Sequence, residues 1–115
     1  MDDKRWQKVF ALVGLGIRGR LAVVGVERVR EAAMKGTLHL ALVASDASRH
    51  SREKVLPLLA AKGVQVVDGA SAATLGAAAG RETTAVIGIV DAQLAKGIRG
   101  IVDSVVRASA RERMV

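Results

Sequence analysis

Cysteine and tyrosine are absent from this 115-residue chain, and Trp6 and Phe10 are its only aromatic residues. Without cysteine there can be no disulfide bond, thiolate zinc site or cysteine nucleophile. The shortage of aromatics excludes RNA-binding modules that stack unpaired bases on aromatic rings, such as the RRM and OB folds. The charged start of the chain and its short first apolar run, Val9 to Val13, argue against a signal peptide or membrane span. We therefore expect a cytoplasmic protein without membrane contact.

Positive charge is what the chain has in excess, with 18 Lys and Arg against 11 Asp and Glu and a net charge of +7. In a domain of 12.0 kDa this excess favours a polyanionic partner, most simply RNA or DNA, although ordinary solubility charge also accounts for it. Residues 1–54 hold 11 of the basic and 6 of the acidic residues, so a basic face is expected in the first half. The length and the 50% hydrophobic content predict one domain, 1–115, with its own core.

The apolar run Leu38 to Ala44 lacks polar alternation, which predicts a central strand covered on both faces. It stops at Ser45-Asp46-Ala47-Ser48, whose short polar side chains can cap a helix. Apolar spacing and turn residues predict the other elements as helices over 4–17, 26–35, 49–62 (interrupted or restarted at Pro57), 72–79 and 92 to about 110 (capped by Asp91), and strands over 20–24, 64–67 and 84–90. This alternation predicts a three-layer α/β/α sandwich with a four-stranded, mixed sheet, followed by a basic end, 107–115, that frays.

Two stretches of the sequence are candidates for an enzyme site. Gly14, Gly16 and Gly19 match the dinucleotide fingerprint G-x-G-x-x-G, but a short strand is expected to follow them instead of the helix that binds the pyrophosphate. We expect these glycines at helix-packing and turn positions, and a dinucleotide-binding enzyme stays a minor alternative. The second stretch is explained by helix capping; its members are Ser45, Asp46, Ser48, His50 and Ser51. We expect no catalytic set, no metal site and no cofactor.

Four motifs carry a resemblance to a known family. They are Gly25-Val26-Glu27-Arg28, Leu42-Val43-Ala44-Ser45-Asp46-Ala47, Leu56-Pro57-Leu58-Leu59, and Leu75-Gly76-Ala77-Ala78-Ala79-Gly80-Arg81-Glu82. In this order and spacing, over roughly Leu12 to Ile98, the chain resembles the L7Ae/L30e family of ribosomal and ribonucleoprotein components, especially its short bacterial branch. The family's best-known members bind kink-turn RNA. The resemblance implies structured RNA as partner, with ribosomal RNA as one candidate, and a non-RNA interaction protein on the same scaffold is the main alternative.

The resemblance also implies where RNA would bind: the amino terminus of the second helix and the loop before the fourth strand. Kink-turn binders open that helix with Gly-Thr-Asn-Glu and carry a lysine one turn later. Here Gly25 keeps the glycine, whereas Val26, Glu27 and Arg28 take the next three places and Glu31 takes the lysine's place. Together with basic neighbours and the loop, the expected RNA-binding residues are Arg18, Arg20, Gly25, Val26, Glu27, Arg28, Arg30, Arg81, Glu82 and Thr83.

The charges of the second helix also have an ordinary explanation. Taken alone, they fit a solvated helix face on which Glu27 pairs with Arg30 and Glu31 pairs with Lys35.

Overall fold

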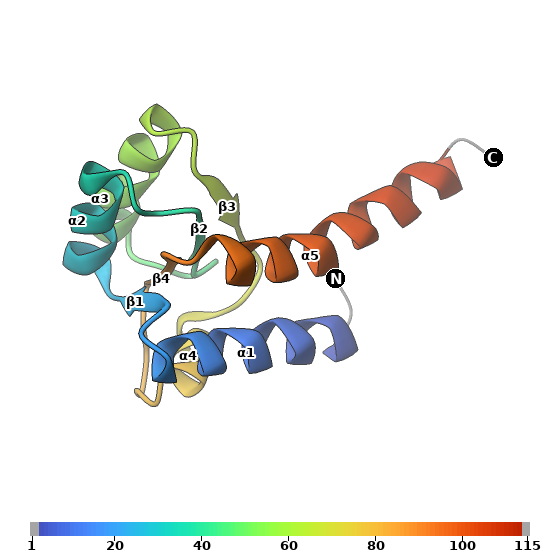
Figure 1. The fold of residues 1–115 in the computed structure, drawn as a ribbon, viewed down its shortest axis with the longest axis horizontal. Coiled ribbons are helices and arrows are strands. Elements are labelled where there is room, and N and C mark those ends of the chain that lie inside the picture. The colour runs from blue at the N-terminus through green and yellow to red at the C-terminus, as the bar shows by residue number, and fades with distance from the viewer. Residues whose placement is uncertain (1–2, 114–115) are drawn as a thin grey trace.

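Residues 3–113 are described by the computed structural model, with side chains described as far as Asp103 (Figure 1). The elements follow as α1 (Asp3–Arg18), β1 (Ala22–Val24), α2 (Val26–Lys35), β2 (Leu40–Val43), α3 (Arg49–Ala61), β3 (Gln65–Val67), α4 (Ala72–Ala78), β4 (Val86–Ile89) and α5 (Ala92–Arg113). Helices α2 and α3 cover one face of the sheet, and α1, α4 and α5 cover the other (Figure 1). This is the predicted three-layer sandwich.

The four strands form a mixed sheet in the order β1-β4-β2-β3. Strand β4 is antiparallel to both neighbours, and β2 is parallel to β3. Strands β1, β2 and β3 therefore point the same way, so their carboxyl ends lie at one end of the sheet. Helices α2, α3 and α4 follow these strands, so all three begin near that end, which is where ligands bind in many open α/β sheets.

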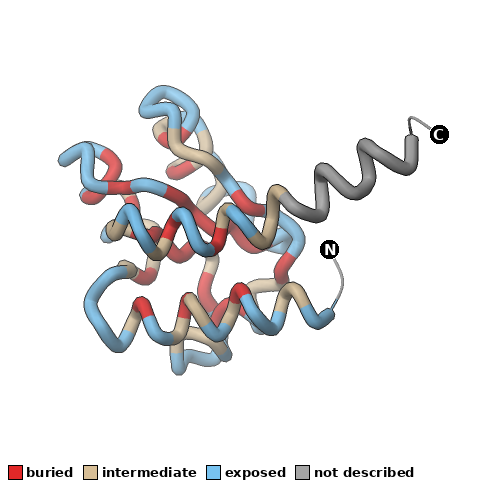
Figure 2. The backbone as a smooth tube through the Cα atoms, turned by 45° about the vertical axis from the view of Figure 1, so that its right-hand side comes forward, coloured by how far each residue is buried: buried red, intermediate tan, exposed pale blue. Residues whose placement is uncertain are grey.

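The core follows from the central position of β2 and β4, in which every residue is buried. Along β2, Leu40 and Leu42 face the α1, α4 and α5 layer, whereas Ala41 and Val43 face α2 and α3. This two-residue alternation with apolar residues on both faces is the reason for the unbroken apolar run in the sequence. Figure 2 shows the buried residues concentrated between the helical layers.

The glycine-rich stretch is helical. Gly14 and Gly16 lie inside α1, and Gly19 lies in the turn that follows. A Cβ atom at Gly16 would overlap the side chain of Leu94, so this glycine lets α1 and α5 approach closely. The strand–turn–helix arrangement that a dinucleotide fingerprint requires is not formed here, and the packing role that we predicted for Gly16 is confirmed.

One helix differs from its prediction. Helix α3 runs without a break through Pro57, where we expected an interruption or a restart. Proline removes one backbone N–H donor, which leaves the carbonyl group of Glu53 without its intrahelical partner. Glu53 and Pro57 are both exposed, so water can bind that carbonyl, while Val55 and Leu59 hold the two halves of α3 against the core.

The end of the chain also differs, since α5 continues to Arg113 instead of ending at about Ala110. The expectation that residues 107–115 fray stays a prediction, and residues 114–115 lie outside the described residues. Among the helices that the structure describes, none is both long and apolar enough to span a membrane.

Candidate nucleic-acid interface

Helix α2 is preceded by Gly25, whose backbone conformation favours glycine. Gly25 has a φ of 101° and a ψ of 159°, a conformation that side-chain-bearing residues rarely adopt. Its N–H donates to the carbonyl oxygen of Val86 at 3.0 Å, and its own carbonyl accepts from the N–H of Val29 at 3.1 Å. Gly25 has no side chain to cap the helix. The N–H groups of the first turn therefore point out of the helix end, where they can bind an anion or a base edge.

The loop between α4 and β4 is folded back onto α4. The N–H of Arg81 donates to the carbonyl oxygen of Gly76 at 2.7 Å, and the N–H of Thr84 donates to that of Ala72 at 3.0 Å. Gly76 is buried beneath the loop, and a Cβ atom there would lie 2.7 Å from both the Glu82 carbonyl oxygen and the Thr83 Cα. The loop backbone is thus fixed, while the side chains of residues 81–83 stay exposed.

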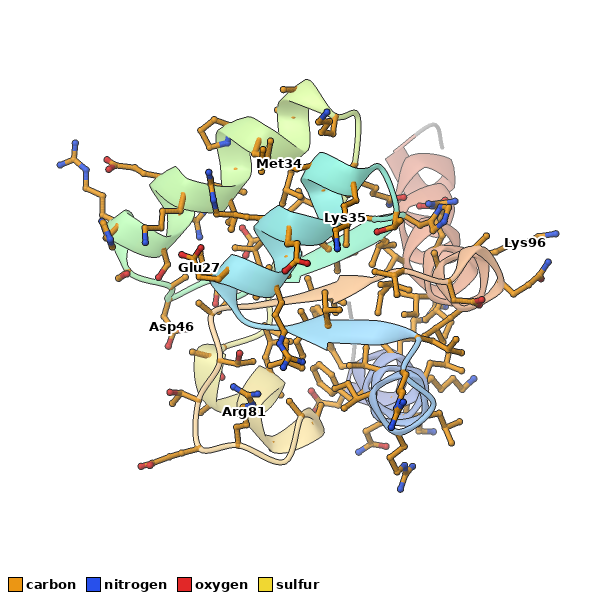
Figure 3. The ribbon with its side chains drawn as sticks, turned by 60° about the vertical axis from the view of Figure 1, so that its left-hand side comes forward. Glu27, Met34, Lys35, Asp46, Arg81 and Lys96 are labelled. Atoms are coloured by element: carbon orange, nitrogen blue, oxygen red, sulfur yellow. The ribbon has the colours of Figure 1, made fainter. Side chains whose placement is uncertain are left out.

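These two segments lie side by side. The hydrogen bond from Gly25 to Val86 joins the start of α2 to the first residue of β4, three positions after Thr83. Figure 3 shows Glu27 and Arg81 on the same side of the molecule, with Asp46 beside them. The structure therefore brings together six of the expected residues: Gly25, Val26, Glu27, Arg81, Glu82 and Thr83.

Glu27 and Arg28 flank the start of α2 on different sides. The Glu27 carboxylate forms an exposed ion pair with Nζ of Lys54 in α3, at 3.3 Å. Arg28 instead lines an open groove of about 660 Å³ with Val23 and Val90, over the edge strand β1. The two side chains therefore offer an acceptor toward α3 and a donor toward the sheet edge.

The remaining expected arginines differ in where they lie relative to this cluster. Arg30 is half-buried and donates from Nη1 to the carbonyl oxygen of Lys54, so it joins α2 to α3. The prediction that Glu27 pairs with Arg30 was wrong, because Glu27 forms its ion pair with Lys54 instead. Arg20 has a φ of 62° and precedes β1, at the opposite end of that strand from Gly25. Arg18, in the last turn of α1, lines a hollow with Gly80 and so lies near the loop.

Lys54 is a member of this site that the sequence did not indicate. It is 27 residues from Glu27, and only the packing of α3 against α2 brings the two side chains together. The local pair between Glu31 and Lys35 was predicted and is confirmed at 2.7 Å. The hydrogen bond from Lys35 and the charge of its ammonium group lower the pKa of the Glu31 carboxyl below its ordinary value.

Two of the polar residues after β2, Asp46 and Ser48, act as helix caps as expected, whereas Ser45 Oγ donates to the carbonyl oxygen of Ala70. Ser48 Oγ accepts from the N–H of Ser51 at 3.1 Å at the start of α3. Asp46 caps a different helix from the one that follows it, because its Oδ1 accepts from the N–H of Ala72 in α4 at 2.7 Å. Within the described part of the chain, no group of three or more His, Cys, Asp or Glu side chains could hold a metal ion.

The comparison with protein families is decisive for the identity of this fold. Residues 13–99 match the model of the ribosomal protein L7Ae/L30e/S12e/Gadd45 family. The chain belongs to this family. The match includes the start of α2 and the loop before β4, as the motifs predicted. It leaves out the first part of α1, residues 3–12, and the greater part of α5, residues 100–113.

Two solved structures show how this family's fold recurs. A Bacillus halodurans protein of unknown function is 30% identical, has a TM-score of 0.77, and aligns over 84% of this chain and 97% of its own. The Giardia lamblia 15.5kD RNA binding protein is 23% identical, has a TM-score of 0.74, and aligns over 90% of this chain and 89% of its own. The chain matches no curated protein.

Proposed function

We propose that this protein binds structured RNA through the amino terminus of α2 and the loop at residues 80–83. The observation that carries the proposal is the uncapped first turn of α2 beside that fixed, exposed loop, in a member of the L7Ae/L30e/S12e/Gadd45 family. The Giardia lamblia neighbour, which is described as RNA-binding, supports it through its shared fold. Ribosomal RNA is one candidate, and co-sedimentation with ribosomal subunits tests it.

The first turn of α2 is suited to an RNA whose duplex is interrupted by non-canonical pairs. Its N–H groups can donate to phosphate oxygens or base acceptors, and Gly25 places no side chain in their way. The Glu27 carboxylate can accept from the N1 and N2 edge of a guanine. The Arg28 guanidinium can donate to guanine O6 and N7 where a non-canonical pair widens the groove.

RNA that binds at the Glu27 carboxylate must compete with the ion pair between Glu27 and Lys54. The Glu27 side chain is 78% exposed, and exposed pairs of this kind contribute at most about 1 kcal/mol. RNA can therefore displace Lys54 from Glu27 at little cost. The released lysine then becomes available for a phosphate, so base recognition and backbone attraction are linked at one place.

The test compares two RNA duplexes, one interrupted by tandem G·A pairs and one uninterrupted. We expect Glu27→Ala and Arg28→Ala each to weaken binding to the interrupted duplex by roughly 1–3 kcal/mol, as for other base contacts. Glu27→Ala should leave binding to the uninterrupted duplex unchanged or tighter, because it removes an anion and releases Lys54. Titration calorimetry or fluorescence anisotropy at fixed salt measures both.

Glu53→Ala is the matched control. It removes the same charge and releases another cation, Arg49, whose Nε lies 2.8 Å from the Glu53 carboxylate on α3. We expect it to leave the preference for the interrupted duplex intact. If Glu27→Ala and Arg28→Ala behave like this control, the start of α2 does not recognise RNA and the proposed function is wrong.

A further inference from the structure

The positive charge of this protein is concentrated on two helices that come from opposite ends of the chain. Helices α1 and α5 together hold nine Lys and Arg against three Asp and Glu, a net charge of +6. The rest of the chain holds nine against eight, a net charge of +1. These helices pack side by side on one face of the sheet (Figure 1). Among residues 3–103, whose side chains are described, the pair holds six Lys and Arg against two Asp and Glu, a net charge of +4, and the other residues hold nine against seven, a net charge of +2. The larger share of the excess charge therefore lies in this pair.

The two helices enclose a shallow hollow of about 340 Å³ with a basic rim and a floor of glycine. Arg5 and Lys8 line it from α1, whereas Gly97, Gly100 and Ile101 line it from α5. A Cβ atom at Gly100 would have no atom within 4 Å, so the backbone of α5 is open to solvent there. A phosphate group could approach this helix closely beside Lys8.

Three lysines of these two helices are exposed: Lys8, which lines the hollow, Lys4 and Lys96. Lys4 and Lys8 are one turn apart on α1, and Lys96 and Gly100 are one turn apart on α5, so each pair shares a helix face. Arg99 has a structural role, because its Nε donates to Gln65 Oε1 at 2.8 Å and its Nη2 to the carbonyl oxygen of His39 at 2.9 Å. The lysines are therefore the cations to test.

This surface is separate from the start of α2. Lys96 points away from the molecule on the side opposite Glu27 (Figure 3). Lys4 and Lys8 precede the residues that match the family, which begin at residue 13. The RNA site proposed at the start of α2 therefore does not account for the positive charge on α1 and α5.

We propose that α1 and α5 form a second RNA-binding surface, which holds the phosphate backbone of a duplex without reading its bases. Lysine ammonium groups are point charges that suit phosphates and give little base discrimination. A membrane surface fits less well, because the aromatic residues of α1, Trp6 and Phe10, stack at 5.2 Å and pack against the core instead of forming an exposed apolar stripe. With two surfaces on opposite sides, one molecule can contact two segments of RNA.

The choice of RNA over another polyanion rests on the function proposed above, so the test separates the two ideas. It measures binding of the uninterrupted RNA duplex to the full chain and to a triple variant, Lys4→Gln, Lys8→Gln and Lys96→Gln. The association constant scales with salt concentration to a power of about −0.9 for each phosphate contact. At 0.1 M salt, each contact therefore raises the association constant by up to about eightfold over its value at 1 M salt. We expect binding to weaken by about tenfold or more, and its salt dependence to become shallower by up to about 0.9 for each phosphate that the variant no longer neutralises.

The matched control is a second triple variant, Lys35→Gln, Arg49→Gln and Lys62→Gln, which removes three exposed cations outside α1 and α5. Both variants have the same net charge, so a bulk effect of charge would weaken them equally, and that result overturns the proposal. Replacing the three lysines of α1 and α5 by arginine should retain binding. The preference for the interrupted over the uninterrupted duplex reports on α2 alone and should survive the first triple variant. If that preference is absent from the wild-type protein while the triple variant still loses duplex binding, the function proposed for α2 fails and the second surface stands.

Discussion

Gly76 is the residue whose replacement tests how the loop before β4 is held. In Gly76→Ala, the new Cβ atom would lie 2.7 Å from the Glu82 carbonyl oxygen and the Thr83 Cα, whereas ordinary contacts begin at 3.4 Å. Both obstructing atoms belong to the backbone, so no side-chain rotation can relieve the overlap. The loop must move away from α4 by about 0.7 Å, the difference between these distances.

The cost of this movement can be isolated by comparison with Gly100→Ala. Both glycines lie inside helices, so both substitutions gain the same intrinsic preference for alanine, about 1 kcal/mol. At Gly100 the new Cβ atom meets no atom within 4 Å. We therefore expect Gly100→Ala to raise the free energy of unfolding by about 0.5–1 kcal/mol. The free energy of unfolding of Gly76→Ala should be about 1–3 kcal/mol lower than that of Gly100→Ala because of overpacking.

Urea unfolding followed by the fluorescence of Trp6, the only tryptophan, measures both variants. Circular dichroism should give the same midpoints if unfolding is two-state. Gly76→Ala should also reduce the preference for the interrupted over the uninterrupted RNA duplex, since it displaces residues 81–83, whereas Gly100→Ala should leave that preference intact. A Gly76→Ala protein as stable as Gly100→Ala would refute the account of a loop fixed against α4.

Two further predictions concern side-chain interactions. Lys35→Ala should raise the pKa of Glu31 toward its ordinary value, measured by NMR titration, because the hydrogen bond and charge that lower it are removed. The pKa of Glu31 is lower in the folded protein than in the unfolded chain, so the ion pair stabilises the protein at pH values above the ordinary carboxyl pKa. This contribution is lost as the pH falls through the folded-state pKa. The free energy of unfolding of Lys35→Ala should therefore change less with pH over that range than that of the wild-type protein. Asp46→Ala should lower the free energy of unfolding by about 1 kcal/mol, because it removes the acceptor for the Ala72 N–H, whereas Asp46→Asn keeps an acceptor and should retain most of the stability; thermal unfolding distinguishes them.

The elements of this fold could be predicted where one local rule decides them. Helix α2 begins and ends where expected, since Gly25 and Gly36 both adopt positive φ angles and Val29 and Ala33 recur on its buried face. The apolar run around Leu40–Val43 indicated a central strand because both of its faces are covered. Pro57 misled the prediction of α3, since the effect of a proline depends on whether the carbonyl that loses its donor can reach water.

The candidate site was less predictable because tertiary contacts complete it. Family resemblance indicated both parts of the binding surface, the start of α2 with Gly25 and Glu27 and the loop with Arg81 and Glu82. No local pattern showed that Glu27 would meet Lys54, or that Arg30 would be engaged by the carbonyl group of Lys54. These contacts depend on how α2 crosses α3. The sequence alone therefore could not distinguish Arg28, which is exposed over the sheet edge, from the half-buried Arg30.

The distribution of charge shows why position along the chain can mislead about position in space. Counted along the sequence, residues 1–54 have a net charge of +5 and residues 55–115 a net charge of +2, which pointed to the first half for a basic face. The fold instead joins the first helix to the last, and this pair holds a net charge of +6. Within residues 3–103, whose side chains are described, this pair holds six Lys and Arg against two Asp and Glu, a net charge of +4. Long-range attraction of RNA should then depend on α1 and α5, whereas discrimination between RNAs should depend on α2. Added salt should therefore weaken the affinity for any RNA duplex far more than it weakens the preference for the interrupted duplex.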